Sequence, residues 1–156
     1  CCSSMGGESV KMRLNSYQAP RRFTDERGTL VCLEAGVHIP FDVRSVVYTC
    51  DVPFVARRGG HAHHALHQFV KCASGSVTVT TISQNGTTET VLTQDSDGVY
   101  IPPMTWSEQC NHTPGTVVLV MSSEHYDESD YIRDLGRFTA LLDAAEPSEG
   151  TNDQTS

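Results

Sequence analysis

The sequence has no long hydrophobic run and few basic residues, and both absences exclude functions. No stretch approaches the roughly 20 apolar residues that a transmembrane helix needs, so we expect no membrane-spanning helix. The 11 Lys and Arg against 19 Asp and Glu leave a formal net charge of −8, which argues against general binding to nucleic acid or anionic membranes. A hydrophobic fraction of 38% over 156 residues is enough for one packed core. We also expect a cytoplasmic protein.

No C-x-x-C pair occurs among the 6 cysteines. Cys32, Cys50 and Cys72 each lie in an apolar run typical of a strand. Buried free thiols behave as small hydrophobic groups, so we expect free cysteines rather than the disulfide framework of a secreted domain.

Short strands separated by turn signals dominate the chain from about residue 12 to residue 120. The expected strands are Gly28–Glu34, Val43–Cys50, Leu66–Cys72, Ser76–Ile82, Thr88–Leu92, Gly98–Ile101 and Thr116–Met121. Asn85-Gly86 between two of them indicates a hairpin. Such a series of strands predicts an all-β sandwich or barrel.

A single helix is expected near the end of the chain. Ser129-Asp130 could cap it, and apolar residues follow from Tyr131 to Leu142 at helical spacing. We predict a flexible start over residues 1–9, one domain over residues 10–143 that includes this helix, and a disordered tail over residues 144–156.

Residues 57–75 contain a His-x-His pair, His61 and His63, preceded by two glycines and followed by Gly75. Side chains alternate along a strand, so the two imidazoles should point to one side, inside a barrel, with tight turns at the glycines. Because histidine titrates near neutral pH, such a pair suits a metal site or proton transfer. His64 should point the other way, and the turn residues His38, His112 and His125 should be exposed.

The His-x-His pair, a polar residue five positions later and Gly75 resemble the first motif of cupin barrels. Gln68 stands where that motif usually has a glutamate, and Ser107 stands where a later motif has its third histidine. Two histidines fall short of the three or four ligands of a zinc or iron site. We therefore predict a cupin barrel (a double-stranded β-helix or jelly roll, with a short C-terminal helix) without a metal, whose histidines act as acid and base.

Several segments together resemble one cupin family. They are Asp25-Glu-Arg-Gly-Thr-Leu30, Ile39-Pro-Phe-Asp-Val-Arg44, Arg57-Arg-Gly-Gly-His-Ala-His63 and Tyr126-Asp-Glu-Ser-Asp-Tyr-Ile-Arg133. Their order and spacing are similar to those of the dTDP-sugar 3,4-ketoisomerases, the WxcM-like cupins. The resemblance implies isomerisation of dTDP-4-keto-6-deoxyglucose to a 3-keto isomer, a homodimer, and no cofactor.

The chemistry of that isomerisation fits histidine. A base must remove the C3 proton, an enediol must form, and a proton must reach C4. We expect His61 to be the base, with His63 orienting it or donating to an oxygen. Tyr48 matches one member of an aromatic pair common in the family, although Val47 precedes it here, and it is a third candidate catalytic residue.

Binding of the nucleotide diphosphate needs cations, and arginine matches phosphate geometry. By resemblance, Arg58 and Arg27 are candidate phosphate ligands, whereas Arg57 is expected in a surface salt bridge. Trp106 could pack beside the sugar or at the mouth of the barrel. Gln68 and Ser107 complete the candidate substrate-binding residues.

Three alternatives remain open at this point. The protein could be a cupin that binds a nucleotide sugar without catalysis, because position 107 and positions 45 and 47 depart from the family pattern. It could be a metal-dependent cupin enzyme. It could also resemble the related 3,5-epimerases, which pair a histidine with an aspartate. The C4 configuration of the product also stays open, with Arg27 favouring the galacto form.

Overall fold

The structure is a computed structural model that describes residues 18–145. The chain divides into two compact units, residues 1–40 and residues 41–156. The expected flexible segment at residues 1–9 and residues 146–156 of the expected tail lie outside the described residues, whereas Ala144 and Ala145, with which that tail was expected to begin, are the last two residues of a helix. The assignment of residues 10–143 to one domain stays a prediction.

In the first unit the described residues form one antiparallel hairpin. Strand β1 (Arg21–Asp25) pairs with β2 (Gly28–Cys32), and Glu26 and Arg27 form the turn. Gly28 opens β2 with a φ of 112°, a conformation that side chains disfavour, which explains a glycine at this turn.

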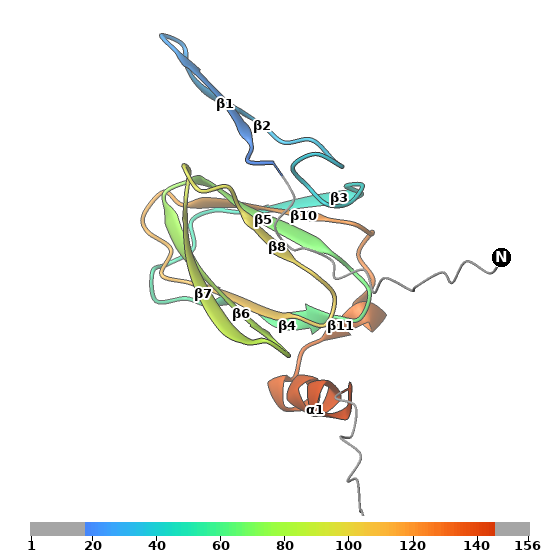
Figure 1. Ribbon diagram of the computed structural model, residues 1–156. Helices are drawn as coiled ribbons and strands as arrows, with labels where there is room; N and C mark the ends of the chain where they lie inside the picture. The colour runs from blue at the N-terminus through green and yellow to red at the C-terminus, as the bar shows by residue number, and fades with distance from the viewer. Residues whose placement is uncertain (1–17, 146–156) are drawn as a thin grey trace, which may run out of the picture. The chain divides into compact units, whose positions relative to one another are not determined.

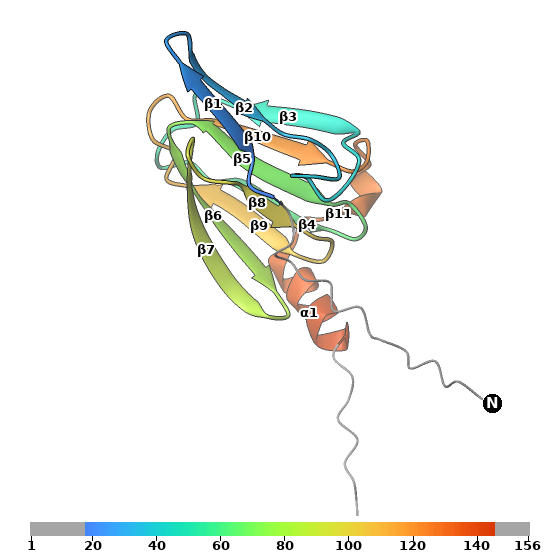
Figure 2. The same cartoon turned by 45° about the horizontal axis from the view of Figure 1, so that its top comes forward.

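The second unit contains two sheets that face each other (Figure 1). The four-stranded sheet has the order β3-β10-β5-β8, and β3, β10 and β5 lie side by side in Figure 2. The five-stranded sheet has the order β11-β4-β9-β6-β7. The strands of the first sheet are β3 (Ser45–Thr49), β5 (Gln68–Ser74), β8 (Val99–Ile101) and β10 (Val117–Ser122). Those of the second are β4 (Arg58–His63), β6 (Ser76–Ser83), β7 (Gly86–Thr93), β9 (Trp106–Cys110) and β11 (Tyr131–Ile132).

The predicted all-β barrel is confirmed, and so is the hairpin at Asn85-Gly86. Strands β6 and β7 pair from Ser76 opposite Thr93 to Ser83 opposite Gly86, so the loop has only two residues. Gly75 joins β5 to β6 at a φ of 73°, and a Cβ there would lie 2.7 Å from the Cα of Thr116. The close approach of these two backbones therefore requires a glycine.

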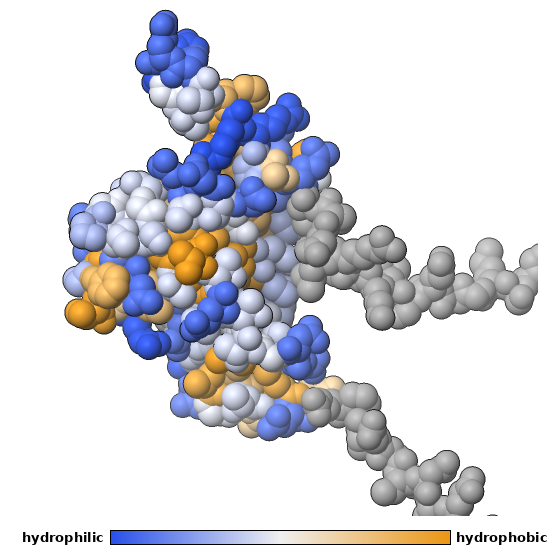
Figure 3. All heavy atoms as spheres, turned by 60° about the vertical axis from the view of Figure 1, so that its left-hand side comes forward, coloured by the Kyte–Doolittle hydropathy of each residue, from blue (hydrophilic) through white to orange (hydrophobic). Residues whose placement is uncertain are grey.

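Two clusters of apolar side chains stabilise the second unit. One is formed by the apolar faces of the strands, namely Val70, Cys72, Val77, Val79, Leu92, Ile101 and Val118. The other, formed by Ala62, Trp106, Ile132 and Phe138, joins the outer face of the five-stranded sheet to helix α1 (Leu135–Ala145). Figure 3 shows hydrophobic surface at helix α1, and Leu135, its first residue, is exposed.

The expected helix start at Ser129-Asp130 is wrong. Asp127 caps a short 3-10 helix (Glu128–Asp130), and the next two residues form β11, paired with β4. Helix α1 begins only at Leu135, after Asp134, whose Oδ1 accepts a hydrogen bond from the backbone N–H of Arg137 at 2.6 Å. Strand pairing therefore overrides the helical spacing of Tyr131 and Ile132.

The predicted free cysteines are confirmed within residues 18–145, where Cys32, Cys50, Cys72 and Cys110 are all free. Cys72 is buried as expected, but Cys50 is exposed because it follows the end of β3. The expected exposure of His38 and His112 is wrong, since both are almost completely buried. No helix within the described part of the chain is long and apolar enough to cross a membrane.

Candidate active site

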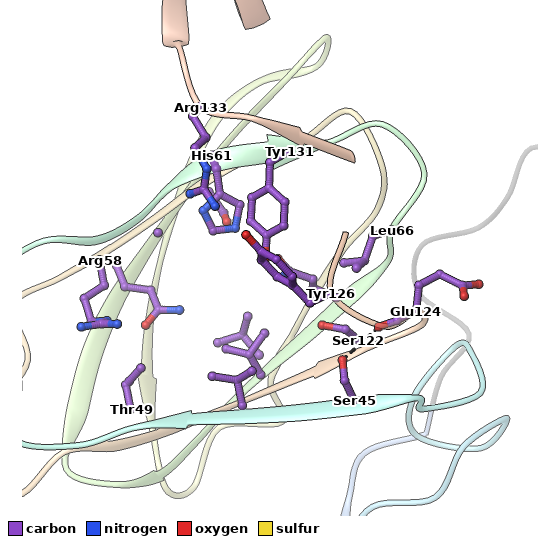
Figure 4. A pocket seen from close by; sticks show the side chains of 17 residues that line it. Ser45, Thr49, Arg58, His61, Leu66, Ser122, Glu124, Tyr126, Tyr131 and Arg133 are labelled. Atoms are coloured by element: carbon purple, nitrogen blue, oxygen red, sulfur yellow. Dashed lines mark hydrogen bonds between the residues drawn. The ribbon is translucent and has the colours of Figure 1, made fainter. Parts of the chain in front are cut away.

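A cavity of about 380 Å³ lies between the two sheets of the second unit. Strand β3 contributes Ser45, Val47 and Thr49 to its wall, and β4 contributes Arg58, Gly59 and His61 (Figure 4). The other lining residues are Leu66, Gln68, Val70, Ser107, Gln109, Val120, Ser122, Glu124, Tyr126, Tyr131 and Arg133. A volume of this size is within the range of small-molecule sites.

A β-bulge in β4 determines which side chains enter the cavity. Arg58 pairs with Gln109 and His61 pairs with Ser107, so one extra residue is inserted on β4 between them. Without the bulge, two residues three positions apart would point to opposite faces. Gly59 and Gly60 have φ of 78° and 70°, and they form this bulge rather than the expected turn before the strand.

His61 and His63 point to the same side of β4, as predicted. Their ring centroids are 4.9 Å apart and the rings are nearly perpendicular. His61 lines the cavity, whereas His63 is only 3% exposed and lies behind it. Ala62 points the other way, into the cluster beneath α1. The alternation of the strand therefore places both rings on the inner face, where only His61 is accessible to a ligand in the cavity.

Both histidines are neutral at neutral pH. Burial lowers the pKa of His61, and the nearby Arg133 guanidinium lowers it further, against a backbone hydrogen bond to Gly59 and the charge of Glu128. Burial and the neighbouring His61 lower the pKa of His63 to about 4, despite its contact with Asp130. The Nε2 atom of each ring has no hydrogen-bond partner among residues 18–145. A neutral His61 beside a cavity can accept a proton.

Asp130 fixes the orientation of His63. Its Oδ2 lies 3.1 Å from Nδ1 of His63, and because a carboxylate only accepts, Nδ1 carries the proton. Asp130 Oδ1 also accepts from the backbone N–H of Ala65 at 2.8 Å, and the Asp130 carbonyl accepts from the N–H of His64 at 3.0 Å. One residue therefore holds both the ring and the chain that follows β4.

A group of aromatic and charged side chains lies beside the histidines. The Arg133 guanidinium is 4.2 Å from the centre of the Tyr131 ring and forms two hydrogen bonds with Glu128, of 2.6 and 2.8 Å. The Tyr126 hydroxyl donates to Glu128 as well. These two donors lower the pKa of Glu128 to about 2, and Glu128 in turn raises the pKa of Arg133. The cation is thus held in place at the cavity wall.

Arg57 and Arg58 differ in their contacts, and the salt bridge expected for Arg57 is present. Arg57 forms an exposed ion pair with Glu108, with a distance of 2.9 Å between Nη1 and Oε2. Arg58 lines the cavity and has no ion-pair partner among the described residues. An arginine without a carboxylate partner can bind an anion without first breaking an ion pair.

The other predicted site residues divide into those that line the cavity and those that do not. Gln68 and Ser107 line it. Trp106 does not, because it precedes Ser107 on β9 and points to the other face, where it is 4% exposed and its ring centre is 5.8 Å from that of Phe138. Trp106 therefore packs in the barrel wall against Phe138 of α1, and does not line the cavity that would hold the sugar.

Tyr48 also points away from the cavity. It is 66% exposed on the outer face of β3, while its neighbours Val47 and Thr49 line the cavity. We assign no catalytic role to Tyr48, which is neither at the cavity nor in the core. Arg27 lies in the first unit, at the turn of the β1–β2 hairpin, and its guanidinium pairs with Asp25. Its expected contact with phosphate stays a prediction.

The residues that sequence analysis missed come from one segment. Tyr126, Tyr131 and Arg133 line the cavity and Asp130 supports it, yet none was a candidate site residue. All belong to the Tyr126–Arg133 segment that carries the family resemblance, and this was the available signal. Interpreting the segment as the start of a helix hid its relation to β4.

Metal ligands are not grouped in the described part of the chain. Within residues 18–145 no set of three or more His, Cys, Asp or Glu side chains is arranged to hold a metal ion. The cavity positions that Gln68 and Ser107 occupy are polar but neutral.

Fold and cavity together define a cupin-type barrel with a histidine at its inner wall. The chain matches the family described as FdtA: WxcM-like, C-terminal, over residues 13–143. The protein belongs to this family, which confirms the family expected from the sequence.

Proteins similar to this chain have been characterised. The TDP-4-oxo-6-deoxy-alpha-D-glucose-3,4-oxoisomerase of Aneurinibacillus thermoaerophilus is 36% identical over 122 residues, which cover 78% of this chain and 88% of that protein. QdtA, a 3,4-ketoisomerase from Thermoanaerobacterium thermosaccharolyticum solved with TDP as a double mutant, is 36% identical, with a TM-score of 0.77 and coverage of 81% and 91%. WlaRB, a TDP-quinovose 3,4-ketoisomerase from Campylobacter jejuni, is 32% identical, with a TM-score of 0.73 and coverage of 78% and 94%.

Proposed function

We propose that this protein is a sugar-nucleotide 3,4-ketoisomerase that converts dTDP-4-keto-6-deoxyglucose to a dTDP-3-keto-6-deoxyhexose. The observation that carries the proposal is a neutral His61, whose buried Nε2 has no hydrogen-bond partner among residues 18–145, on the wall of a cavity that Arg58 also lines without an ion-pair partner among those residues. The 3,4-ketoisomerase relatives that are 32 to 36% identical support the same reaction. The enzyme is then an isomerase that moves a keto group between adjacent carbons.

His61 acts as the base in this reaction. It removes the proton from C3 of the 4-keto sugar, an enediol forms between C3 and C4, and the same ring returns the proton to C4. Its lowered pKa keeps the ring neutral at neutral pH, so one of its two nitrogens can accept a proton. His63, held by Asp130, packs edge-on against His61 and limits the orientations of the catalytic ring.

Arg58 binds the diphosphate of the nucleotide. Its position on the cavity wall without an ion-pair partner among the described residues supports this role. Arg27 remains a second candidate phosphate ligand, and Gln68 and Ser107 are candidate hydrogen-bonding residues for the sugar. None of these binding roles requires a cofactor.

The reaction proceeds without a metal, since proton transfer by His61 and a neutral enediol intermediate need none. Gln68 and Ser107 at the cupin ligand positions support this view, because an amide and a hydroxyl are poor ligands for zinc or iron. Turnover should survive exhaustive chelation. A stoichiometric metal whose removal abolishes activity would contradict the proposal.

A homodimer is part of the proposal. Within the described residues, β3 has a hydrogen-bonded neighbour on one side only, and its side chains Val46 and Tyr48 are 58% and 66% exposed. An apolar edge strand is a surface that proteins usually cover. Sedimentation should therefore give twice the 17.0 kDa mass of the chain. We further expect a cytoplasmic location.

One experiment tests the function directly. The protein is incubated with dTDP-4-keto-6-deoxyglucose in deuterated water and the sugar is followed by NMR. A 3-keto product is expected, with its C4 configuration readable from the same spectrum. Binding without any turnover would indicate a cupin that only binds nucleotide sugars.

The same spectrum separates ketoisomerisation from 3,5-epimerisation. A paired histidine and aspartate is the feature expected of the epimerases, but His63 and Asp130 form such a pair here, so this feature does not separate the two reactions. An epimerase would leave the keto group at C4 and introduce deuterium at C3 and C5. If no 3-keto product forms and deuterium enters at C5, the protein is an epimerase and our proposal is wrong.

A further inference from the structure

The proposed isomerisation needs a second proton-transfer group, because protons must also move between the oxygens on C3 and C4. His61 serves the carbons, so another group must serve the oxygens. Besides His61, the titratable side chains at the cavity are Arg58, Glu124, Tyr126, Tyr131 and Arg133. The arginines do not release protons at neutral pH.

Three further candidates remain, and their contacts distinguish them. Glu124 forms an ion pair with Arg44, with 3.3 Å between Nη1 and Oε2. The Tyr126 hydroxyl already donates to Glu128, and its side chain is largely exposed. The Tyr131 hydroxyl has no hydrogen-bond partner among residues 18–145. It is therefore the one phenol of the two that is free to contact a ligand.

Strand pairing places Tyr131 beside both histidines. Tyr131 lies directly opposite His63 in the antiparallel pair of β11 and β4, so the two side chains share the inner face. The Tyr131 ring centre is 4.3 Å from that of His63 and 4.9 Å from that of His61. Figure 4 shows the Tyr131 ring extending from β11 into the cavity next to His61.

The charge of Arg133 helps Tyr131 both to donate a proton and to exist briefly as a phenolate. Burial raises the pKa of Tyr131, which keeps the hydroxyl protonated before reaction; the Arg133 charge lowers it, and the smaller contributions of the Glu128 and Asp130 charges raise it. The guanidinium lies 4.2 Å from the ring centre and is held there by Glu128. It would therefore stabilise a transient phenolate.

The facing wall offers no substitute for this group. Strand β3 contributes only Ser45, Val47 and Thr49 to the cavity, and none of these titrates near neutral pH. From these contacts we propose that Tyr131 is a catalytic residue, the acid and base at the sugar oxygens, working with His61 at the carbons.

The proton transfers balance without any further reactant. His61 takes the C3 proton, the C–H electrons form the C3–C4 double bond, and the carbonyl oxygen on C4 takes the Tyr131 proton. In the second half the phenolate takes the proton from the oxygen on C3, whose electrons form the new carbonyl. The double-bond electrons then take the proton from His61 at C4. Both side chains end in their starting states.

Tyr131→Phe tests this assignment, because it removes one oxygen and keeps the ring packed between the histidines and Arg133. We expect kcat for the isomerisation to fall by about 100-fold or more, with KM little changed. Tyr48→Phe is the matched control, since it removes the same atom from the outer face of β3, and its rate should stay at the wild-type value. Unchanged affinity for TDP would show that the variant is folded.

The outcomes distinguish this inference from the proposed function on which it rests. If Tyr131→Phe isomerises at the wild-type rate while His61→Asn is inactive, the function stands and the role of Tyr131 is wrong. If Tyr126→Phe is the variant that loses kcat, the acid is the other phenol and the inference is likewise overturned. If the wild-type protein forms no 3-keto sugar, the proposed function itself fails.

Discussion

Asp130 Oδ2 and His63 Nδ1 lie 3.1 Å apart, and this contact joins the end of the 3-10 helix to the histidine strand 67 residues earlier in the sequence. The same carboxylate accepts backbone hydrogen bonds from Ala65 and Leu66. His63 is therefore fixed by a residue outside its own strand, and His61, packed against it, is fixed in turn.

Replacing Asp130 should lower activity through the histidines it positions. Asp130→Asn removes the charge, and we expect a loss of stability of about 1.5–3 kcal/mol because several buried hydrogen bonds change. We also expect a lower kcat, partly restored in Asp130→Glu. Asp127→Asn is a suitable control, because Asp127 only caps the adjacent 3-10 helix. A kcat equal to that of the wild type in folded Asp130→Asn would show that the contact is purely structural.

His61→Asn should keep the fold and slow turnover by about two or more orders of magnitude, because the base at the carbon is lost. Deuterium incorporation at the sugar carbon should fall in parallel. His63→Asn should have the smaller effect, since His63 does not line the cavity. Near wild-type rates in both variants would mean that a cupin that only binds nucleotide sugars is the better account.

Arg58→Ala should weaken TDP binding by about 2 kcal/mol, the loss of a charge-assisted contact. Arg57→Ala provides a matched control one residue away, because Arg57 pairs with Glu108 instead of lining the cavity. Titration calorimetry with TDP compares the two variants. Equal affinities of the two variants for TDP would show that Arg58 does not bind the diphosphate.

Gly59 and Gly60 allow the bulge in β4 to be tested. Both have positive φ, but a Cβ on Gly59 would lie 2.8 Å from the Ser107 carbonyl oxygen, whereas one on Gly60 meets nothing within 4 Å. Gly60→Ala should cost about 1–2 kcal/mol of stability from backbone strain alone. Gly59→Ala should cost more and also lower activity, because β9 must shift. Urea unfolding and isomerisation rates of the two variants measure this difference.

Stability should fall as the pH is lowered from 6.5 to 4. In that range the unfolded chain protonates His63 at its ordinary pKa of 6.5, while the folded protein, with a pKa of about 4, does not. The unfolded state thus binds more protons, so the free energy of unfolding rises with pH across this window, by up to about 3 kcal/mol. Urea unfolding at several pH values measures the slope, which His63→Asn should flatten. A slope unchanged in that variant would assign the effect to other groups.

The alternation of strand residues explains what sequence analysis of the site achieved and where it went wrong. The common orientation of His61 and His63 follows from it directly. The same rule places Trp106 and Ser107 on opposite faces of β9, and Val47 and Tyr48 on opposite faces of β3. Only one member of each pair can therefore contact a ligand in the cavity. Which member faces inward depends on the sheet that covers each strand, and the local sequence does not contain that information.

The sequence by itself determined the barrel, its main hairpin and the family, because turn residues, β-branched runs and spaced motifs are local signals. Only the tertiary structure decided the composition of the site. The bulge that brings Arg58 and His61 to one face arises from the pairing of β4 with β9. Tyr131 and Asp130 contact His63 only because β11 pairs with β4. That pairing joins segments nearly 70 residues apart, and its stability depends on contacts between them that no local sequence pattern contains.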